Sequence, residues 1–470
     1  MSYSVPFEVP ELSYEEALHE LHATLKFGIQ PMLETVVDML AECGDPDLCY
    51  DCLQVAGTNG KTSTSRYSAA ILAGEGYRAA LYTSPELVSY TERMEVDGRP
   101  VSEEAFAHGM SAALEAGRRV NARRSAAGER PYDVTEFDLL TVAALVIYAE
   151  AGVDVAVLEV GMGGRWDATS AAKSIKAVTV TGVGLDHMRI LGDTLEAISS
   201  EKAAVIKAGR SCVLGSGTAT PDSVEDVFLD QCAAEGVTPV LLRPELLSDA
   251  AGEMHPGVPR VHEGMPQASF RVTERPDGIG APLVVTVTTP RATYEGLAVR
   301  KPAYQATNIA CAVVLCENFL DRSLDTEKLA ASVMACPTPG RFDVVRTEPV
   351  GLIDACHNPQ SVDTFLTAVR AIAPVVEDRP ALLCAVLADK DVAGIVELLA
   401  PEFPRVYVTQ TMSPRAMAAA ELAEIFAQAG RVPAGVYPTV AEALAALVDV
   451  PYVACGSITL AGEVAGLLRG

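Results

Sequence analysis

The sequence has no run of the ~18–20 apolar residues that a membrane-spanning helix needs. The longest apolar stretch, residues 139–149, is too short and is followed by Glu150. The N-terminal residues are acidic and lack the basic and then apolar pattern of a secretory signal. We therefore expect a cytoplasmic protein that has no membrane partner.

Positive charge is scarce. The chain has 36 Lys and Arg residues against 62 Asp and Glu residues, a formal net charge of −26. A field of this sign repels nucleic acid, so we expect no nucleic-acid partner. An anionic substrate must instead be held by a local basic site.

The cysteines give no sign of a disulfide framework. Their number, 11, is odd, and they are scattered through 470 residues, as in proteins of a reducing compartment. Cys49 and Cys52 form a CxxC pair with no second pair nearby, so we expect neither a zinc site nor a redox pair. With 49% apolar and 21% charged residues, the chain has the composition of a folded globular protein.

Strand and helix patterns alternate along the chain, which is typical of a parallel α/β fold. The N-terminal part predicts strands over 52–56, 78–83, 153–160 and 177–183, and helices over 61–73, 137–149 and 194–208. The alternation restarts after the Pro- and Gly-containing stretch 336–341. We therefore predict two domains, a large one with a mostly parallel sheet over 1–337 and a smaller Rossmann-like α/β domain over 338–470.

The strongest chemical signal is a glycine loop between a predicted strand and a predicted helix, Gly57-Thr58-Asn59-Gly60-Lys61-Thr62. Glycines let backbone N–H groups approach phosphate, the helix N-terminus adds a positive dipole, and a lysine reaches the outer phosphates. The hydroxyl of Thr62 or Ser63 is available for Mg²⁺. The spacing differs from the common Walker pattern, because only two residues separate the glycines.

Polar residues follow the next predicted strands. Ser84 comes after the strand 78–83, Glu159 is the next-to-last residue of the strand 153–160, and His187 follows the strand 177–183. Ligands of open parallel sheets bind outside the carboxyl ends of the strands. Carboxylate and hydroxyl oxygens suit Mg²⁺. The three endings therefore predict a Mg²⁺–nucleotide site around the glycine loop.

The sequence also resembles the folylpolyglutamate synthases, which are often bifunctional with dihydrofolate synthase and belong to the Mur-ligase superfamily. The matching motifs follow the family's order over about residues 14–464. They are KFGI (26–29), GTNGKTST (57–64), TSPELVSYTERM (83–94), LEVGMGGRWDAT (158–169), GLDHMRILGDTLEAISSEKAAVIK (184–207), NIACA (308–312), PGRFDVV (339–345), DACHNP (354–359), LADKD (387–391) and ACGSITLAGEV (454–464).

The resemblance implies a role for each matching residue. The ATP-binding set is Gly57, Thr58, Asn59, Gly60, Lys61, Thr62, Ser63, Asn308, Arg341 and Asp354. The metal set is Ser84, Glu159, His187 and Lys202, of which Lys202 and His187 also count as catalytic together with Lys61. The substrate set is Asp167 and Ala168 near the pterin, and His357 and Ser457 for the incoming glutamate.

The implied activity is ATP-dependent ligation of L-glutamate to folate, with dihydropteroate as a second acceptor. It proceeds through an acyl phosphate and uses two Mg²⁺ sites, one of them bridged by a carbamate on Lys202. The resemblance implies a monomer. Five residues depart from the family's usual pattern: Thr62 replaces glycine, Glu86 replaces histidine, Ala355-Cys356 replaces Gly-Ala, and Trp166 replaces leucine.

Two other functions remain open from the residues. A Mur-type ligase that adds an amino acid to a UDP-linked cell-wall precursor shares the glycine loop and the fold. A nucleotide-binding protein without ligase chemistry is the other, and it predicts gaps in the catalytic set that the sequence does not have.

Overall fold

The computed structural model describes residues 3–24, 32–245, 260 and 262–469. Its chain forms two compact units. The N-terminal unit consists of Met1–Arg271, Thr286–Glu295 and Ala306–Cys336, and the C-terminal unit consists of Val272–Val285, Gly296–Gln305 and Pro337–Gly470. The KFGI motif at 26–29 lies outside the described residues.

The large sheet has eleven strands in the order β11-β10-β9-β8-β7-β6-β1-β5-β2-β3-β4. From β9 to β2 the neighbours are parallel, and β3 and β4 add an antiparallel edge. The strands are β1 (Asp51–Ala56), β2 (Ala79–Tyr82), β3 (Met94–Val96), β4 (Arg99–Pro100), β5 (Val155–Glu159), β6 (Ile175–Gly182), β7 (Ser211–Gly217), β8 (Val240–Pro244), β9 (Gln267–Glu274), β10 (Leu283–Thr288) and β11 (Thr293–Val299).

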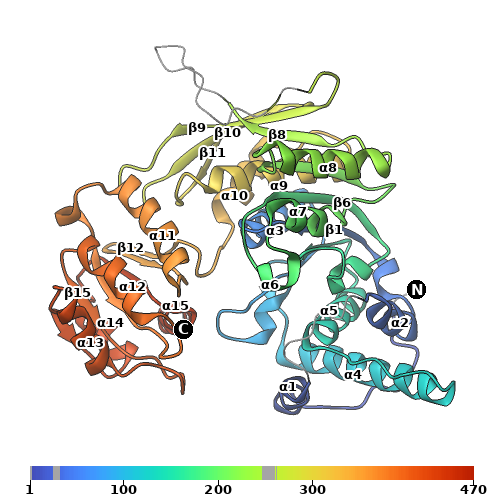
Figure 1. Ribbon diagram of the computed structural model, residues 1–470, viewed down its shortest axis with the longest axis horizontal. Coiled ribbons are helices and arrows are strands. Elements are labelled where there is room, and N and C mark those ends of the chain that lie inside the picture. Colours follow the sequence, from blue (N-terminus) through green and yellow to red (C-terminus); the bar gives the residue numbers. More distant parts are fainter. Residues whose placement is uncertain (1–2, 25–31, 246–259, 261, 470) are drawn as a thin grey trace. The chain divides into compact units, whose positions relative to one another are not determined.

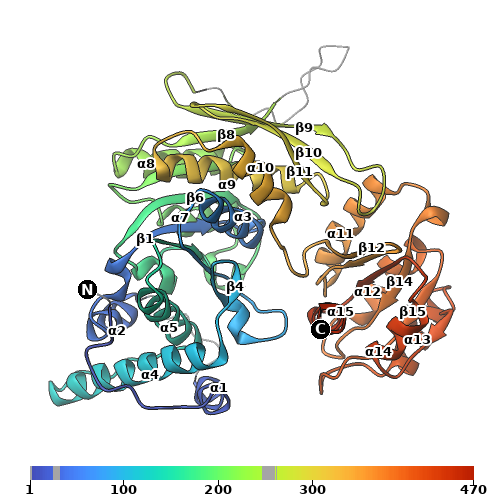
Figure 2. The ribbon, with the colours of Figure 1, turned by 180° about the vertical axis from the view of Figure 1, so that it is seen from behind.

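Helices cover both faces of this sheet (Figures 1 and 2). The long helix α4 packs against α1. The α-helices are α1 (Tyr14–Ala23), α2 (Glu34–Glu42), α3 (Lys61–Gly74), α4 (Glu103–Ala126), α5 (Glu136–Ala151), α6 (Met188–Leu191), α7 (Leu195–Ala203), α8 (Asp222–Ala234), α9 (Gln305–Leu320) and α10 (Thr326–Ala335). Short 3₁₀ helices are η1 (Pro46–Cys49), η2 (Tyr90–Arg93) and η3 (Ala168–Ala171).

Continuous apolar runs explain the central elements. The strand β5 is buried at every position, as expected for a parallel strand covered on both faces. The helix α5 is buried from Leu139 to Ala149 and begins with a capping box, in which Thr135 and Asp138 each bond the other's backbone N–H. The predicted helix 137–149 therefore exists, with two more residues at its C-terminal end and one at its N-terminal end.

The predicted helix 194–208 is too long. The helix α7 begins after Thr194, whose hydroxyl caps Ala197 N–H, and it ends at Ala203. Tight turns follow, with Val205 N–H bonded to Lys202 O, so the backbone leaves the helix before Gly209. The glycine belongs to the later turn, where its φ is +81°.

The C-terminal unit holds the second sheet, with six strands in the order β12-β13-β17-β14-β15-β16. All neighbours are parallel except β12 and β13. The strands are β12 (Asp343–Thr347), β13 (Val350–Ile353), β14 (Ala381–Cys384), β15 (Val406–Val408), β16 (Gly435–Val436) and β17 (Tyr452–Cys455). The helices are α11 (Pro359–Ile372), η4 (Val376–Asp378), α12 (Val392–Leu399), η5 (Ala400–Glu402), α13 (Ala419–Gln428), α14 (Val440–Ala446) and α15 (Ile458–Arg469).

The predicted fold class is confirmed: a large, mostly parallel α/β sheet and a second, smaller parallel α/β sheet. Among the helices that the structure describes, none combines the length and the apolar character needed to cross a membrane.

Candidate nucleotide and metal site

The glycine loop joins β1 to α3, as the sequence predicts. Gly57 has φ +142° and Gly60 has φ +83°, which side chains rarely adopt. A Cβ on Gly57 would lie 2.0 Å from Thr181 Oγ1, and one on Gly60 would lie 2.3 Å from Asn308 Oδ1. Both positions therefore require glycine. The structure also places Asn308, which lies on α9, directly against the loop.

Thr181 is a loop-supporting residue that the sequence analysis missed. It lies on β6, where its hydroxyl donates a hydrogen bond of 2.6 Å to Asn59 O. Thr58 is held from the same side, because its backbone N–H bonds Gly182 O and its hydroxyl accepts Gly184 N–H. Two threonines among the apolar residues of the predicted strand 177–183 were the available signal.

Two lysines converge on one carbonyl of this loop. Lys61 Nζ donates to Gly57 O and Thr58 O at 3.1 Å each. Lys202 Nζ, from α7, donates to Gly57 O at 2.9 Å. Lys202 is only 4% exposed. Burial, and then the neighbouring charge of Lys61, lower the pKa of Lys202 from 10.5 to about 8.

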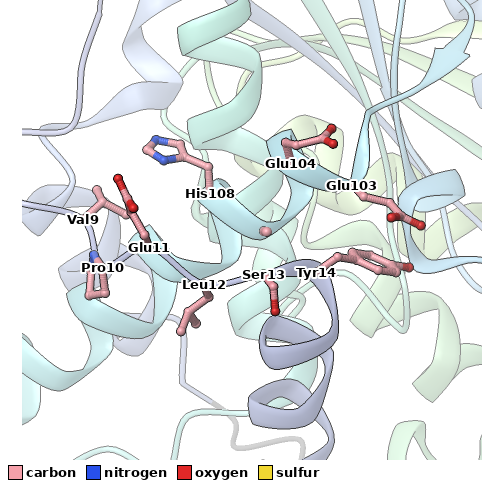
Figure 3. Close-up of a pocket in the computed structure, with 10 residues that line it drawn as sticks. Val9, Pro10, Glu11, Leu12, Ser13, Tyr14, Glu103, Glu104 and His108 are labelled. Carbon is pink, nitrogen blue, oxygen red and sulfur yellow. The ribbon is translucent and has the colours of Figure 1, made fainter.

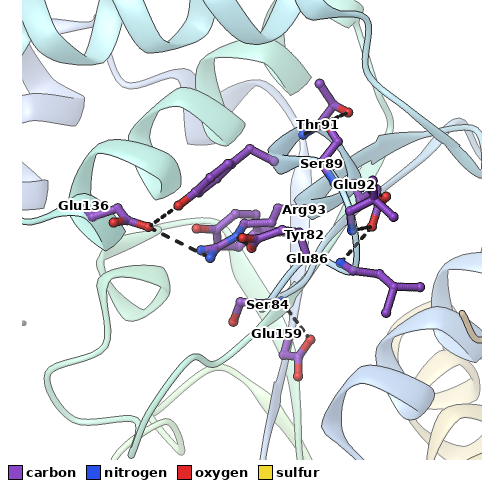
Figure 4. A network of polar contacts seen from close by, with 12 residues as sticks. Tyr82, Ser84, Glu86, Ser89, Thr91, Glu92, Arg93, Glu136 and Glu159 are labelled. Atoms are coloured by element: carbon purple, nitrogen blue, oxygen red, sulfur yellow. Dashed lines mark hydrogen bonds and ion pairs between the residues drawn. The ribbon is translucent and has the colours of Figure 1, made fainter. Parts of the chain in front are cut away.

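Glu159 ends β5 and is buried at the foot of the loop. Its Oε1 accepts a hydrogen bond of 2.8 Å from Thr62 Oγ1, at the start of α3. Its Oε2 accepts one of 3.3 Å from Ser84 N–H, after β2 (Figure 4). A carboxylate and two hydroxyl-bearing residues from three elements meet here. These are hard oxygen donors, so the residues present fit Mg²⁺.

His187 stands apart from this group. It lies between β6 and α6 with φ +49°, and its side chain is 46% exposed. Its Nε2 is 3.5 Å from Asp186 Oδ2. Within the described chain, no hydrogen bond or ion pair joins it to Glu159 or Lys202. Nor do three His, Cys, Asp or Glu side chains gather as metal ligands in the residues described.

Asp167 shapes the loop that follows β5. Its Oδ2 accepts from the N–H groups of Gly161 and Met162, and its Oδ1 accepts from Thr169 N–H and Oγ1. Burial raises the pKa of Asp167 although these hydrogen bonds oppose the rise. The carboxylate is thus engaged by its own loop. Ala168 is buried at the first position of η3.

The same loop is fastened to the helix that carries Lys202. Arg165 N–H bonds Glu201 O at 3.0 Å, and its Nε donates to Glu201 Oε1 at 2.9 Å. The side chain of Trp166, the only tryptophan of the chain, is left 41% exposed beside this attachment.

In the C-terminal unit, predicted residues gather at the carboxyl ends of β13 and β17, which are parallel neighbours. Asp354 directly follows β13, and Ser457 follows β17 by two residues. The loops after the strands are joined by a 3.1 Å hydrogen bond from Gly456 N–H to Cys356 O. Ser457 is buried, and its Oγ accepts Leu460 N–H at the start of α15.

Asp354 organises its own surroundings. Its Oδ2 accepts from Phe342 N–H at 2.8 Å, and its Oδ1 accepts from Cys356 N–H at 2.9 Å. Burial raises its pKa, and Arg341 lies near enough to oppose that rise. His357 Nδ1 is 2.9 Å from Ala355 O, which orients the imidazole.

One further pocket, of about 390 Å³, lies elsewhere in the N-terminal unit (Figure 3). It is lined by Val9–Tyr14 and by residues of the first turns of α4, with Glu11, Glu103 and Glu104 at its wall. None of the predicted site residues lines it, so the acidic pocket is separate from the candidate site.

Comparison with known proteins places the chain in a family. Residues 55–213 match the Mur ligase middle domain, and residues 340–454 match the glutamate ligase domain of Mur ligases. A dihydrofolate synthase/folylpolyglutamate synthase of Mycobacterium tuberculosis is 32% identical over 397 residues, which cover 83% of this chain and 76% of that protein. The chain belongs to the folylpolyglutamate synthase/dihydrofolate synthase family.

Other members of the family match with different coverage. A Haloferax volcanii protein named as a bifunctional folylpolyglutamate synthase/dihydropteroate synthase is 35% identical over 361 residues. That match covers 76% of this chain but only 39% of the longer Haloferax protein. Among solved structures, Mycobacterium tuberculosis folylpolyglutamate synthase complexed with ADP and AMPPCP has a TM-score of 0.75 at 27% identity, covering 97% of this chain and 98% of that one.

Proposed function

We propose that this protein is an ATP-dependent ligase that joins L-glutamate to a folate. Membership of the folylpolyglutamate synthase/dihydrofolate synthase family supports this reading. The observation that carries it is the loop geometry, in which Lys61 and Lys202 meet at Gly57 O beside the Glu159–Thr62 contact. The nucleotide is ATP, since a similar structure binds ADP and AMPPCP.

The chemistry needs a leaving group better than oxide. The folate carboxylate attacks the γ-phosphorus of ATP, the bond to the β-phosphate oxygen breaks, and ADP leaves an acyl phosphate behind. The amine of glutamate then attacks the acyl carbon, phosphate departs, and the amide nitrogen loses a proton. In such transfers the protein mainly positions groups and neutralises charge.

The residues have distinct tasks in this proposal. The loop from Gly57 to Ser63 and Lys61 cradle the phosphates, with Asn308, Arg341 and Asp354 holding the rest of the nucleotide. Ser84 and Glu159 would hold Mg²⁺, which neutralises phosphate charge when bound. The family resemblance adds His187 to this set, although His187 stands apart from them in the structure. For the substrates, Asp167 and Ala168 lie in the pterin-binding segment, and His357 and Ser457 receive glutamate.

Lys202 has the environment that a carbamate requires. Addition of CO₂ needs a neutral amine and releases one proton, and a pKa of about 8 leaves far more neutral amine at neutral pH than an exposed lysine has. A carbamate on Lys202 would supply negatively charged oxygen atoms that can hold a second Mg²⁺. We further propose that the protein is a cytoplasmic monomer that acts in folate metabolism.

Release of ADP by the purified protein with Mg-ATP and L-glutamate tests the function. We expect release when tetrahydrofolate or dihydropteroate is added, and mass spectrometry of the product should show one added glutamyl residue. Activity with a UDP-linked peptide precursor and none with folates would instead support the Mur-type alternative, which the comparisons disfavour.

A further inference from the structure

The segment that carries Ser84 is a tightly organised loop between β2 and β3. A backbone hydrogen bond of 2.9 Å from Thr83 N–H to Arg93 O closes its base. The carboxylate of Glu92 lies inside it and accepts the N–H groups of Leu87 and Val88, at 2.9 and 3.2 Å. The loop therefore holds its shape through internal contacts, with Ser84 at one end and Arg93 at the other.

Arg93 fastens this loop to its surroundings (Figure 4). Its Nε donates to Glu86 Oε2 at 2.5 Å, and its Nη2 is 4.0 Å from Glu136 Oε1, on the first turn of α5. The guanidinium lies 5.0 Å from the centre of the Tyr90 ring, whose hydroxyl also donates to Glu136. The side chain of Arg93 is only 11% exposed.

This arrangement explains Glu86, which stands where the family usually has histidine. Its carboxylate is the close partner of the buried Arg93, and its own side chain is 22% exposed. The neutral amide of glutamine would leave Arg93 with only the more distant Glu136. Removing one partner of a largely buried ion pair costs more than the pair contributes, because the remaining charge is left uncompensated.

The hydrogen bond between Ser84 and Glu159, which depends on the position of this loop, is a weak one. Ser84 N–H reaches Glu159 Oε2 at 3.3 Å, longer than the ~2.9–3.0 Å typical of N–H···O bonds. A small displacement of the loop would break it. Glu86 lies only two residues beyond Ser84, so the Arg93–Glu86 ion pair acts on the same short segment.

We propose that Arg93 is a positioning residue that, through Glu86, holds Ser84 beside Glu159 and so completes the Mg²⁺ side of the nucleotide site. This inference rests on the proposed Mg-ATP function. Replacing Arg93 should therefore lower the part of the nucleotide affinity that depends on Mg²⁺. The part of the affinity that comes from the glycine loop should stay unchanged.

The test is calorimetric binding of AMPPCP, with excess Mg²⁺ and with EDTA, to the wild type, Arg93→Gln, Arg93→Lys and Glu86→Gln. In Arg93→Gln we expect the gain in affinity from Mg²⁺ to fall about tenfold or more, since losing a residue that orients a metal ligand typically costs about 10–100-fold in metal affinity. Affinity in EDTA should not change. Arg93→Lys should recover part of the gain, because it keeps the charge but not the planar fork.

Arg78→Gln is the matched control. Arg78 pairs with Asp97 at 3.3 Å at the far end of the same β2–β3 hairpin, and both side chains are about half exposed. We expect this variant to bind as the wild type does. Glu86→Gln, which keeps Arg93 and Glu136, provides the measurement if Arg93→Gln does not fold.

A folded Arg93→Gln or Glu86→Gln protein that gains as much affinity from Mg²⁺ as the wild type would overturn the inference. An equal loss in EDTA and in Mg²⁺ would also overturn it, because it would indicate general damage to the loop. The binding assay contains no folate. A wild type that binds Mg–AMPPCP but does not ligate folate would therefore refute the proposed function without touching the role of Arg93.

Discussion

Replacing Lys202 by methionine should make the N-terminal unit more stable and the enzyme inactive. Lys202 is buried with a pKa of about 8 instead of 10.5, so the fold disfavours its protonated form. The lowering of the Lys202 pKa from 10.5 to about 8 corresponds to about 3.5 kcal/mol, at ~1.4 kcal/mol per pKa unit. Methionine removes this penalty and keeps a similar apolar volume.

The lost hydrogen bond opposes part of the gain. Lys202 Nζ no longer donates to Gly57 O, which is worth about 1 kcal/mol. Gly57 O still accepts from Lys61, so it is not left without a partner. The net expectation is about 2–3 kcal/mol of added stability at pH 7, together with the loss of most ligase turnover and retained ATP binding.

The stability gained in Lys202→Met must depend on pH. Because the folded pKa lies below the unfolded one, the penalty is present in full below about pH 8 and disappears as the pH rises from about 8 to 10.5. The advantage of Lys202→Met over the wild type should shrink over that window. Urea denaturation in CO₂-depleted buffer, followed by the fluorescence of Trp166, measures it in the N-terminal unit.

Lys176→Met is the control, because Lys176 is exposed and 3.8 Å from Asp51, a surface pair expected to contribute little. A Lys202→Met protein that is no more stable than the wild type at pH 7 would refute the reasoning. So would a gain that does not change between pH 7 and pH 10.

Three more predictions address the surrounding site. Lys61→Ala should abolish ADP release, because Lys61 is the only lysine in the loop from Gly57 to Ser63; retained turnover would remove Lys61 from its role. Gly60→Ala should weaken AMPPCP binding at least tenfold, since the new Cβ would lie 2.3 Å from Asn308 Oδ1 at a φ of +83°, and calorimetry with unchanged affinity would contradict this. Arg66 Nη2 and Glu95 Oε1 form a buried ion pair of 2.7 Å between α3 and β3. Arg66→Met should cost about 3–5 kcal/mol in urea denaturation, and the double replacement Arg66→Met, Glu95→Met much less, whereas equal losses would argue against an uncompensated charge.

Much of the fold follows from apolar runs and glycine turns. The predicted strand 52–56 and helix 61–73 correspond to β1 and α3 within one residue at each end. In these segments the apolar residues follow a clear pattern, and glycine residues mark where the element ends. In contrast, no prediction covers α4, because its small and charged residues show no simple apolar stripe, and its burial comes from packing against α1, α2 and α5.

In the candidate site too, the sequence pattern identifies some residues, and others are brought together only by tertiary packing. Strand ends identify Ser84 and Glu159, since parallel neighbours bring their carboxyl ends together, and the two are hydrogen-bonded. The convergence of Lys202 on Gly57 O depends on how α7 packs, which the sequence pattern does not contain; only the resemblance pointed to that residue. The contacts of Thr181 with Asn59 and of Arg93 with Glu86 also depend on tertiary packing.

The most direct test of glutamate ligation by this protein is ADP release with Mg-ATP and L-glutamate, with dihydropteroate or tetrahydrofolate added in turn. We expect release that depends on a folate acceptor, with a product one glutamyl residue longer. Release with both acceptors would indicate a bifunctional enzyme, and release with tetrahydrofolate alone a tail-extending one. No acceptor-dependent release from a protein that binds Mg-ATP would contradict the assignment of glutamate ligation to folate.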